Sequence, residues 1–120
     1  MFSLNDNMKY WFYNKPTDMR KSYYSLSGLV TNKMKMNVLN GNVFIFINRR
    51  RNMIKILHME SGGLTLYSKL LEEGLFKLPI CDTEGESLNL EWCDLIMMIE
   101  GIKNDPNNRL KRLKTNRLCQ

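Results

Sequence analysis

The clearest periodic signal in the chain is a succession of three apolar runs in its middle third. They are VFIFI (43–47), MIKILHM (53–59) and LTLYSKL (64–70). Each is rich in β-branched, aromatic or large aliphatic residues, and the polar stretches 48–52 and 60–63 separate them like turns. The pattern predicts a three-stranded antiparallel meander. Because the first run is apolar at every position, its strand should be covered on both faces of the sheet.

Two other stretches have the spacing of amphipathic helices. After Pro16, either Thr17 or Asp18 can cap a helix that we expect to run from about Asp18 to Val30. Its apolar stripe is Met19, Tyr23, Leu26 and Val30. The second helix is expected near residues 90–100. Its stripe is Trp92, Leu95, Ile96, Ile99 and Ile102, and Gly101 suits a left-handed helix stop.

These elements predict an α+β fold in which the meander packs with an N-terminal and a C-terminal helix. One or two further short strands are expected, at 8–13 (MKYWFY) and as an edge strand within 72–79 (EEGLFKLP). The expected core consists of Val43, Phe44, Phe46, Ile54, Ile56, Leu66, Trp92, Leu95 and Ile99.

The chain of 120 residues favours one compact domain, which we place at 1–105. Residues 106–120 follow KNDPNN and carry positive charge with only a fragmentary apolar stripe. We therefore expect a basic, mobile tail that is dispensable for folding, because it offers too little apolar surface to offset the entropy of ordering it.

Charge is strongly segregated along the chain. Residues 1–55 hold ten basic and two acidic residues, residues 56–102 hold two basic and nine acidic, and residues 103–120 hold six basic and one acidic. A clustered basic face attracts polyanions more strongly than a modest net charge of +6 would. A plainer interpretation is that the basic and acidic parts attract each other within the fold. The sequence leaves both interpretations open.

Candidate catalytic chemistry is sparse. His58 is the one histidine, and in the middle of a strand it is expected to be a packing or surface residue. The three cysteines (Cys81, Cys93 and Cys119) form no C-x-x-C pair, so neither a zinc site nor a disulfide framework is expected. Nucleotide-binding glycine patterns and nucleophile motifs are absent from the sequence. We expect no enzymatic activity, no cofactor and no metal.

The expected location is the reducing cytoplasm. The N-terminus lacks the charge and apolar pattern of a signal peptide, and the longest apolar run, residues 43–47, is far shorter than a membrane span. The chain is therefore expected to have no contact with a membrane.

Three blocks give the chain a family resemblance: PTDMRKSYYSLSGLV (16–30), VFIFINRRRNMIKIL (43–57) and GGLTLYSKLLEEGLFKLP (62–79). In this order they resemble the small accessory protein (the Orf2 or TnpB-type product) of insertion sequences of the IS66 type. The resemblance extends over about residues 10–102. HMESGG (58–63) departs from it, since a W-W-D-G-D-G stretch is common there.

The resemblance implies a non-catalytic participant in DNA transposition that acts with element DNA and a separate transposase. Two basic groups match the family blocks, Arg20 with Lys21 and the group Arg49, Arg50, Arg51 and Lys55. Arginine forks bind phosphate oxygens two at a time, and Arg20 is expected in the first turn of its helix, where backbone N–H groups also favour a phosphate. We expect both groups to converge on one face and bind the DNA backbone.

Two other functions remain open. In the first, the chain is a protein adaptor: its acidic middle and the helix that contains Trp92 dock on the transposase, without binding to DNA. In the second, carboxylates between Glu60 and Glu100 chelate magnesium as in a nuclease. Their scatter through loops without a recognisable motif favours a solvated surface instead. The sequence does not indicate the DNA bound or the oligomeric state.

Overall fold

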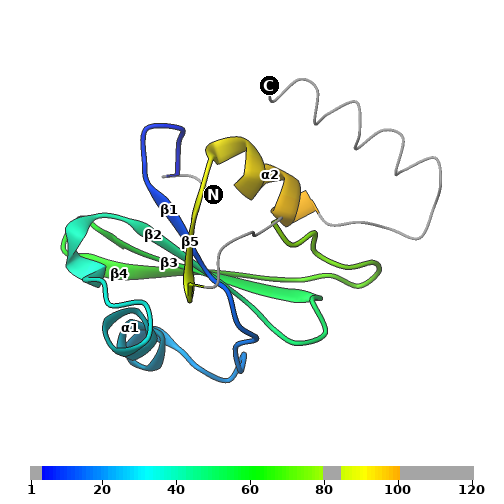
Figure 1. Ribbon diagram of the computed structural model, residues 1–120, viewed down its shortest axis with the longest axis horizontal. Helices are drawn as coiled ribbons and strands as arrows, with labels where there is room; N and C mark the ends of the chain where they lie inside the picture. The colour runs from blue at the N-terminus through cyan, green and yellow to red at the C-terminus, as the bar shows by residue number, and fades with distance from the viewer. Residues whose placement is uncertain (1–3, 80–84, 101–120) are drawn as a thin grey trace.

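A five-stranded mixed sheet with a helix on each face forms the body of the molecule (Figure 1). The computed structural model describes residues 4–79 and 85–100. The elements are β1 (Tyr10–Tyr13), α1 (Tyr23–Asn32), the 3₁₀ helix η1 (Val38–Asn40), β2 (Val43–Ile47), β3 (Met53–Glu60), β4 (Gly63–Leu70), β5 (Ser87–Leu90) and α2 (Trp92–Glu100). The strand order is β4-β3-β2-β1-β5. The expected α+β class is confirmed, although the sheet is larger than the predicted meander.

The predicted meander is present as β2, β3 and β4, which pair antiparallel in sequence order. Two strands extend the sheet beyond β2. The first, β1, lies parallel to β2 with Tyr10 opposite Val43, and the second, β5, lies antiparallel to β1 with Tyr10 opposite Leu90. The prediction of an edge strand within 72–79 is wrong. In this segment only Leu75 forms an isolated β-bridge, and the sheet ends at β4 instead.

Every side chain of β2 is buried, as its uninterrupted apolar pattern predicted. Alternate residues of a strand point to opposite faces, so β2 contributes to two separate cores. On one face Val43, Ile45 and Ile47 pack in a cluster that includes Leu95 and Met98 of α2. On the other face Phe44 and Phe46 pack in a cluster that includes residues of α1. The helices therefore cover opposite faces of the sheet (Figure 1).

Most of the expected core residues are buried. Those confirmed are Val43, Phe44, Phe46, Ile54, Ile56, Leu95 and Ile99. Leu66 and Trp92 are only half-buried. Leu66 lies on the edge strand β4, which pairs with no other strand of the described residues on its outer side, and Trp92 is the first residue of α2.

The first helix begins later than predicted. α1 starts at Tyr23 rather than near Asp18, and Ser22 precedes it in an extended conformation. The reason is a local turn: the Asp18 carboxylate accepts a hydrogen bond from the backbone N–H of Arg20, and the Lys21 N–H donates to the Asp18 carbonyl oxygen. Asp and Asn side chains stabilise such turns at the expense of helix.

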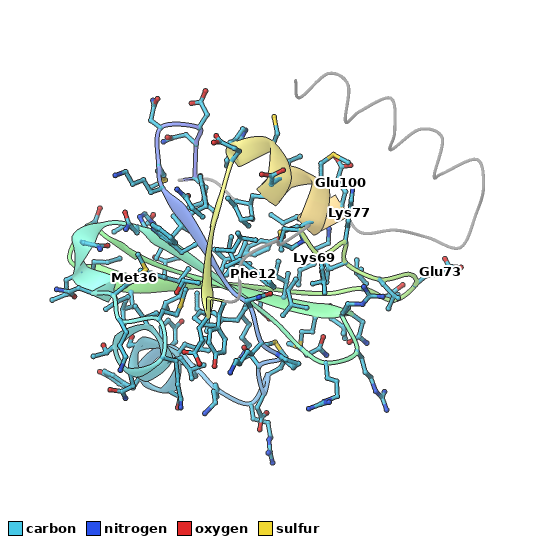
Figure 2. The ribbon with its side chains drawn as sticks, viewed as in Figure 1. Phe12, Met36, Lys69, Glu73, Lys77 and Glu100 are labelled. Carbon is cyan, nitrogen blue, oxygen red and sulfur yellow. The ribbon has the colours of Figure 1, made fainter. Side chains whose placement is uncertain are left out.

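The last turn of α2 is held by a lysine from the sheet. Nζ of Lys69 on β4 donates a hydrogen bond of 3.1 Å to the Ile99 carbonyl oxygen, and Figure 2 shows Lys69, Lys77 and Glu100 together where α2 ends. A cation there complements the partial negative charge of a helix C-terminus. The expected stop at Gly101 and the basic tail lie outside the described residues. Within them, neither helix has the length and apolarity needed to cross a membrane.

Phe46 provides a test of this two-core arrangement. Its side chain is fully buried, and its ring lies 6.1 Å from that of Tyr13 between centroids. We expect Phe46→Ala to lower the free energy of unfolding by about 3–5 kcal/mol, because it removes buried contacts and leaves a cavity under α1. Denaturant unfolding followed by tryptophan fluorescence measures this. The exposed-residue control Leu39→Ala should change it by less than about 0.5 kcal/mol, and equal effects of the two substitutions would contradict the arrangement.

Candidate nucleic-acid interface

The turn between β2 and β3 is organised by the side chain of Asn48. Its Oδ1 accepts hydrogen bonds from the backbone N–H groups of Asn52 and Met53, each 3.1 Å long. Its Nδ2 donates to Oδ1 of Asn52 at 2.7 Å. In the backbone, the Arg51 N–H donates to the Asn48 carbonyl oxygen at 3.0 Å. The five-residue turn is therefore a closed hydrogen-bonded unit, a role for Asn48 that the sequence reasoning missed.

A second segment holds the turn from outside. The Leu71 N–H donates to the Asn52 carbonyl oxygen at 2.8 Å, and the Phe76 N–H donates to the Arg51 carbonyl oxygen at 2.6 Å. Phe76 is itself fully buried in the core on the α2 face. The backbone of the turn is thus connected to the core, and its position relative to the sheet is fixed.

The side chains of Arg49, Arg50 and Arg51 extend from this fixed turn into solvent. All three residues are exposed, and none forms an ion pair or a side-chain hydrogen bond with any described residue. Glu72 and Glu73, in the segment that packs on the turn, are exposed and form no ion pair with the arginines. The sequence predicted a turn at residues 48–52, and the structure confirms that the arginines lie in one.

Lys55 joins the two basic groups predicted from the sequence. It lies on β3 opposite Phe46, on the face that α1 covers, and is half-buried. Its Nζ donates a hydrogen bond of 2.7 Å to the carbonyl oxygen of Lys21, in the loop that leads into α1. This bond satisfies one of three ammonium donors and brings the main chain at Lys21 to the sheet.

The loop before α1 also reaches the end of β2 from which the arginine turn departs. The Thr17 N–H donates to the carbonyl oxygen of Ile47, the last residue of β2, at 2.9 Å. Thr17 is one of the few buried polar residues. Lys21, Lys55 and the three turn arginines therefore lie around the same end of the sheet. We call these five residues the basic end.

Arg20 differs from the other candidates because an acidic neighbour already binds it. Its Nε lies 3.0 Å from each carboxylate oxygen of Asp18, and its Nη2 lies 2.6 Å from Oδ2. These side-chain hydrogen bonds hold the pKa of the Asp18 carboxyl well below its usual range. Arg20 also precedes α1 instead of lying in its first turn. The prediction that helix N–H groups beside Arg20 favour a phosphate is therefore wrong. An aspartate two residues before an arginine was the sequence signal for this pairing.

The aromatic residues of the basic half are mostly unavailable for stacking on bases. Tyr10 and Tyr13 are buried. Burial raises the pKa of Tyr10 to about 12, and its hydroxyl donates to the Asn5 carbonyl oxygen. Tyr24 is 89% exposed, whereas Tyr23 is 43% exposed although its place in the apolar stripe predicted a core position. Tyr23 is the first residue of the helix.

His58 is a buried side chain on β3, in agreement with a packing role. Its Nδ1 lies 3.5 Å from Oε2 of Glu60 without hydrogen-bond geometry.

Among residues 4–79 and 85–100, no three His, Cys, Asp or Glu side chains lie close enough together to hold a metal ion. Residues 81–84, part of the acidic stretch behind the nuclease hypothesis, lie outside the described residues. A cavity of about 710 Å³ lies at the β5 edge of the sheet, between β5, α2 and residues 77–79.

The Asn48 side chain should contribute measurably to stability. Asn48→Ala removes the acceptor for two backbone N–H groups and the donor to Asn52 in a half-buried turn. We expect the free energy of unfolding to fall by about 1–3 kcal/mol, as when buried polar groups lose their partners. Asn32→Ala, an exposed substitution at the end of α1, is the control and should have little effect. Equal thermal melts for Asn48→Ala and the unsubstituted protein would show that the turn does not depend on this side chain.

Comparison with known proteins shows to which family the chain belongs. The chain is 30% identical over 102 residues to an uncharacterized protein, y4hO, of Sinorhizobium fredii (strain NBRC 101917 / NGR234). The aligned residues cover 85% of this chain and 87% of that protein. No solved structure matches. The family model described as IS66 Orf2 like protein matches residues 8–109, which include every candidate residue described above. The chain therefore belongs to the IS66 Orf2-like family.

Proposed function

We propose that this protein is a non-catalytic accessory factor of transposition that binds the phosphate backbone of DNA through its basic end. Membership of the IS66 Orf2-like family supports the process. The basic end supports the mode of action. In this proposal the protein acts in the cytoplasm, beside the separate transposase of its element, and the DNA is that of the element ends.

The observation that carries the proposal is that three neighbouring arginines on a fixed turn have no ion-pair partner among the described residues, in contrast to Lys15 and Arg20. Lys15 forms an ion pair of 3.2 Å with Glu86, and Arg20 is bound by Asp18. Arg49, Arg50 and Arg51 have no such partner among the described residues, so binding to a phosphate would not break an existing ion pair. Charge-assisted, bidentate hydrogen bonds from arginine to phosphate are among the strongest polar contacts that proteins make.

Rigidity of the turn adds to this argument. The backbone is fixed by Asn48 and by the segment 71–76, so binding would restrict only the arginine side chains and not the loop itself. Less conformational entropy is lost when the binding element is already ordered. In addition, Arg51 has a φ of 61°, a left-handed conformation that glycine or asparagine adopts more readily than arginine. An arginine in that position is consistent with a role for its side chain.

The arginine turn can be tested by the salt dependence of DNA binding. Each phosphate contact on duplex DNA contributes ~0.9 to the slope of log affinity against log salt concentration. Replacing Arg49, Arg50 and Arg51 with serine should therefore make the slope shallower by roughly 2.7, while the thermal melt changes little because exposed turn residues contribute little to stability. Titration of duplex DNA into the protein at several salt concentrations measures the slope.

A matched control removes three lysines elsewhere. Lys9, Lys33 and Lys35 are exposed. Lys9 precedes β1 and lies near the start of β2, while Lys33 and Lys35 follow the C-terminal end of α1. The triple replacement of these lysines by serine lowers the net charge equally but should leave the slope unchanged. Equal losses of slope would contradict binding at the basic end, and binding seen only with transposase present would favour an adaptor instead.

Asp18 provides a substitution that should strengthen binding. In Asp18→Asn, the side-chain oxygen can still accept from the Arg20 N–H and keep the local turn, but the ion pair with the guanidinium is lost. Arg20 then becomes available beside the basic end. We expect tighter DNA binding and a slope steeper by up to ~0.9, in the same salt titration. Weaker binding by this variant would show that Asp18 itself is required at the interface.

A further inference from the structure

β4 forms an edge of the sheet, and its outward backbone groups can be assigned. β3 and β4 are joined by the two-residue turn Ser61–Gly62, in which both φ angles are positive (50° and 81°). In such a hairpin the flanking residues, Glu60 and Gly63, form a hydrogen-bonded pair, and hydrogen-bonded residues then alternate along the strand. The bond from the Leu71 N–H to the Asn52 carbonyl oxygen continues the same alternation beyond β4.

The alternation leaves four residues whose N–H and C=O groups point away from β3. These are Leu64, Leu66, Ser68 and Leu70. Among the described residues, none of their backbone groups is hydrogen-bonded to another segment. A row of unpaired donors and acceptors of this length is a template for another strand.

Three of these four residues are leucines, and their side chains make one face of the edge largely apolar. Leu64 and Leu66 remain half-buried in the folded chain, and Leu70 is 61% exposed. Exposed edges are commonly protected by proline, bulges or outward charges. β4 has no proline, and its one charged residue, Lys69, is directed to the other face, where it binds the end of α2.

We propose that a second copy of this chain pairs antiparallel along β4, so that two sheets become one ten-stranded sheet. A two-fold axis at Tyr67 pairs all four outward residues: Leu64 with Leu70 of the second copy, and Leu66 with Ser68. Lys69 then faces Thr65, so no like charges oppose each other across the axis. The opposite edge is a poorer candidate, since β5 has only four residues, of which Ser87 and Asn89 are polar.

The pairing has a geometric consequence for the basic end. A two-fold axis between antiparallel neighbours in one sheet is perpendicular to the sheet, so corresponding faces of the two copies lie on the same side. The two α1 helices and the two Lys55 side chains would therefore share one face of the ten-stranded sheet, with an arginine turn at each end. The proposal does not rest on DNA binding, because the β4 edge exists whatever the basic end contacts.

The experiment combines light scattering with hydrogen exchange of assigned backbone amides on the full chain without DNA. We expect a dimer whose fraction rises with protein concentration. In the monomer the amides of Leu64, Leu66, Ser68 and Leu70 should exchange rapidly, while those of Thr65, Tyr67 and Lys69 are protected by β3. In the dimer all seven should be protected. A protein that stays monomeric, or a dimer in which the four outward amides still exchange rapidly, would overturn the proposal.

A charge at the edge should weaken the dimer. Leu70→Lys disrupts two symmetry-related pairs with Leu64, and we expect the dimer dissociation constant to rise by about tenfold. Leu78→Lys is the control: it makes the same change at a residue that is 38% exposed and lines the cavity beside β5, at the opposite edge. Thermal melts of the two variants check that both fold. An equal effect of the two substitutions, or none for Leu70→Lys, would contradict pairing along β4.

Discussion

The burial of β2 on both of its faces is the constraint on which the rest of the structure depends. A strand whose side chains are all apolar cannot leave either face in water, so one helix must cover each side of the sheet. Its backbone must also be paired on both edges, which β3 and β1 accomplish. The arginine turn follows directly from this strand. Three exposed arginines are thus attached to a strand that is buried along its whole length, and this fixes the position of their backbone.

The sequence predicted well those parts of the fold whose causes are local. The meander was found with boundaries within one residue, because each strand is a compact apolar run and each turn is short and polar. The parallel pairing of β1 with β2 was missed, since it depends on α1 carrying the chain back across the sheet and leaves no local pattern. β5 was not predicted, because SLNL is too short to show alternation. At Asp18, a side-chain turn prevailed over helix propensity.

The sequence predicted which basic residues lie close together but not which of them already have partners. Composition identified the cluster of basic residues, and the structure brings Lys21, Lys55 and the arginine turn to one end of the sheet. The sequence predicted the same role for Arg20 and Arg49, although Asp18, two residues before Arg20, was a signal that Arg20 has a partner. The part played by Asn48 was also hidden, because an asparagine in a turn has many possible partners and only the folded backbone selects among them.

The pairing of the first strand with the last has a consequence for how the chain folds as it is made. The meander β2–β3–β4 closes through neighbouring segments and can form as soon as it is synthesised. By contrast, Tyr10 pairs with Leu90, so β1 leaves the ribosome early and stays incompletely paired until β5 emerges. Contacts so distant along the chain form slowly, because a long loop must be closed first. Completion of the sheet, and with it the core under α2, can therefore occur only after β5 has been synthesised.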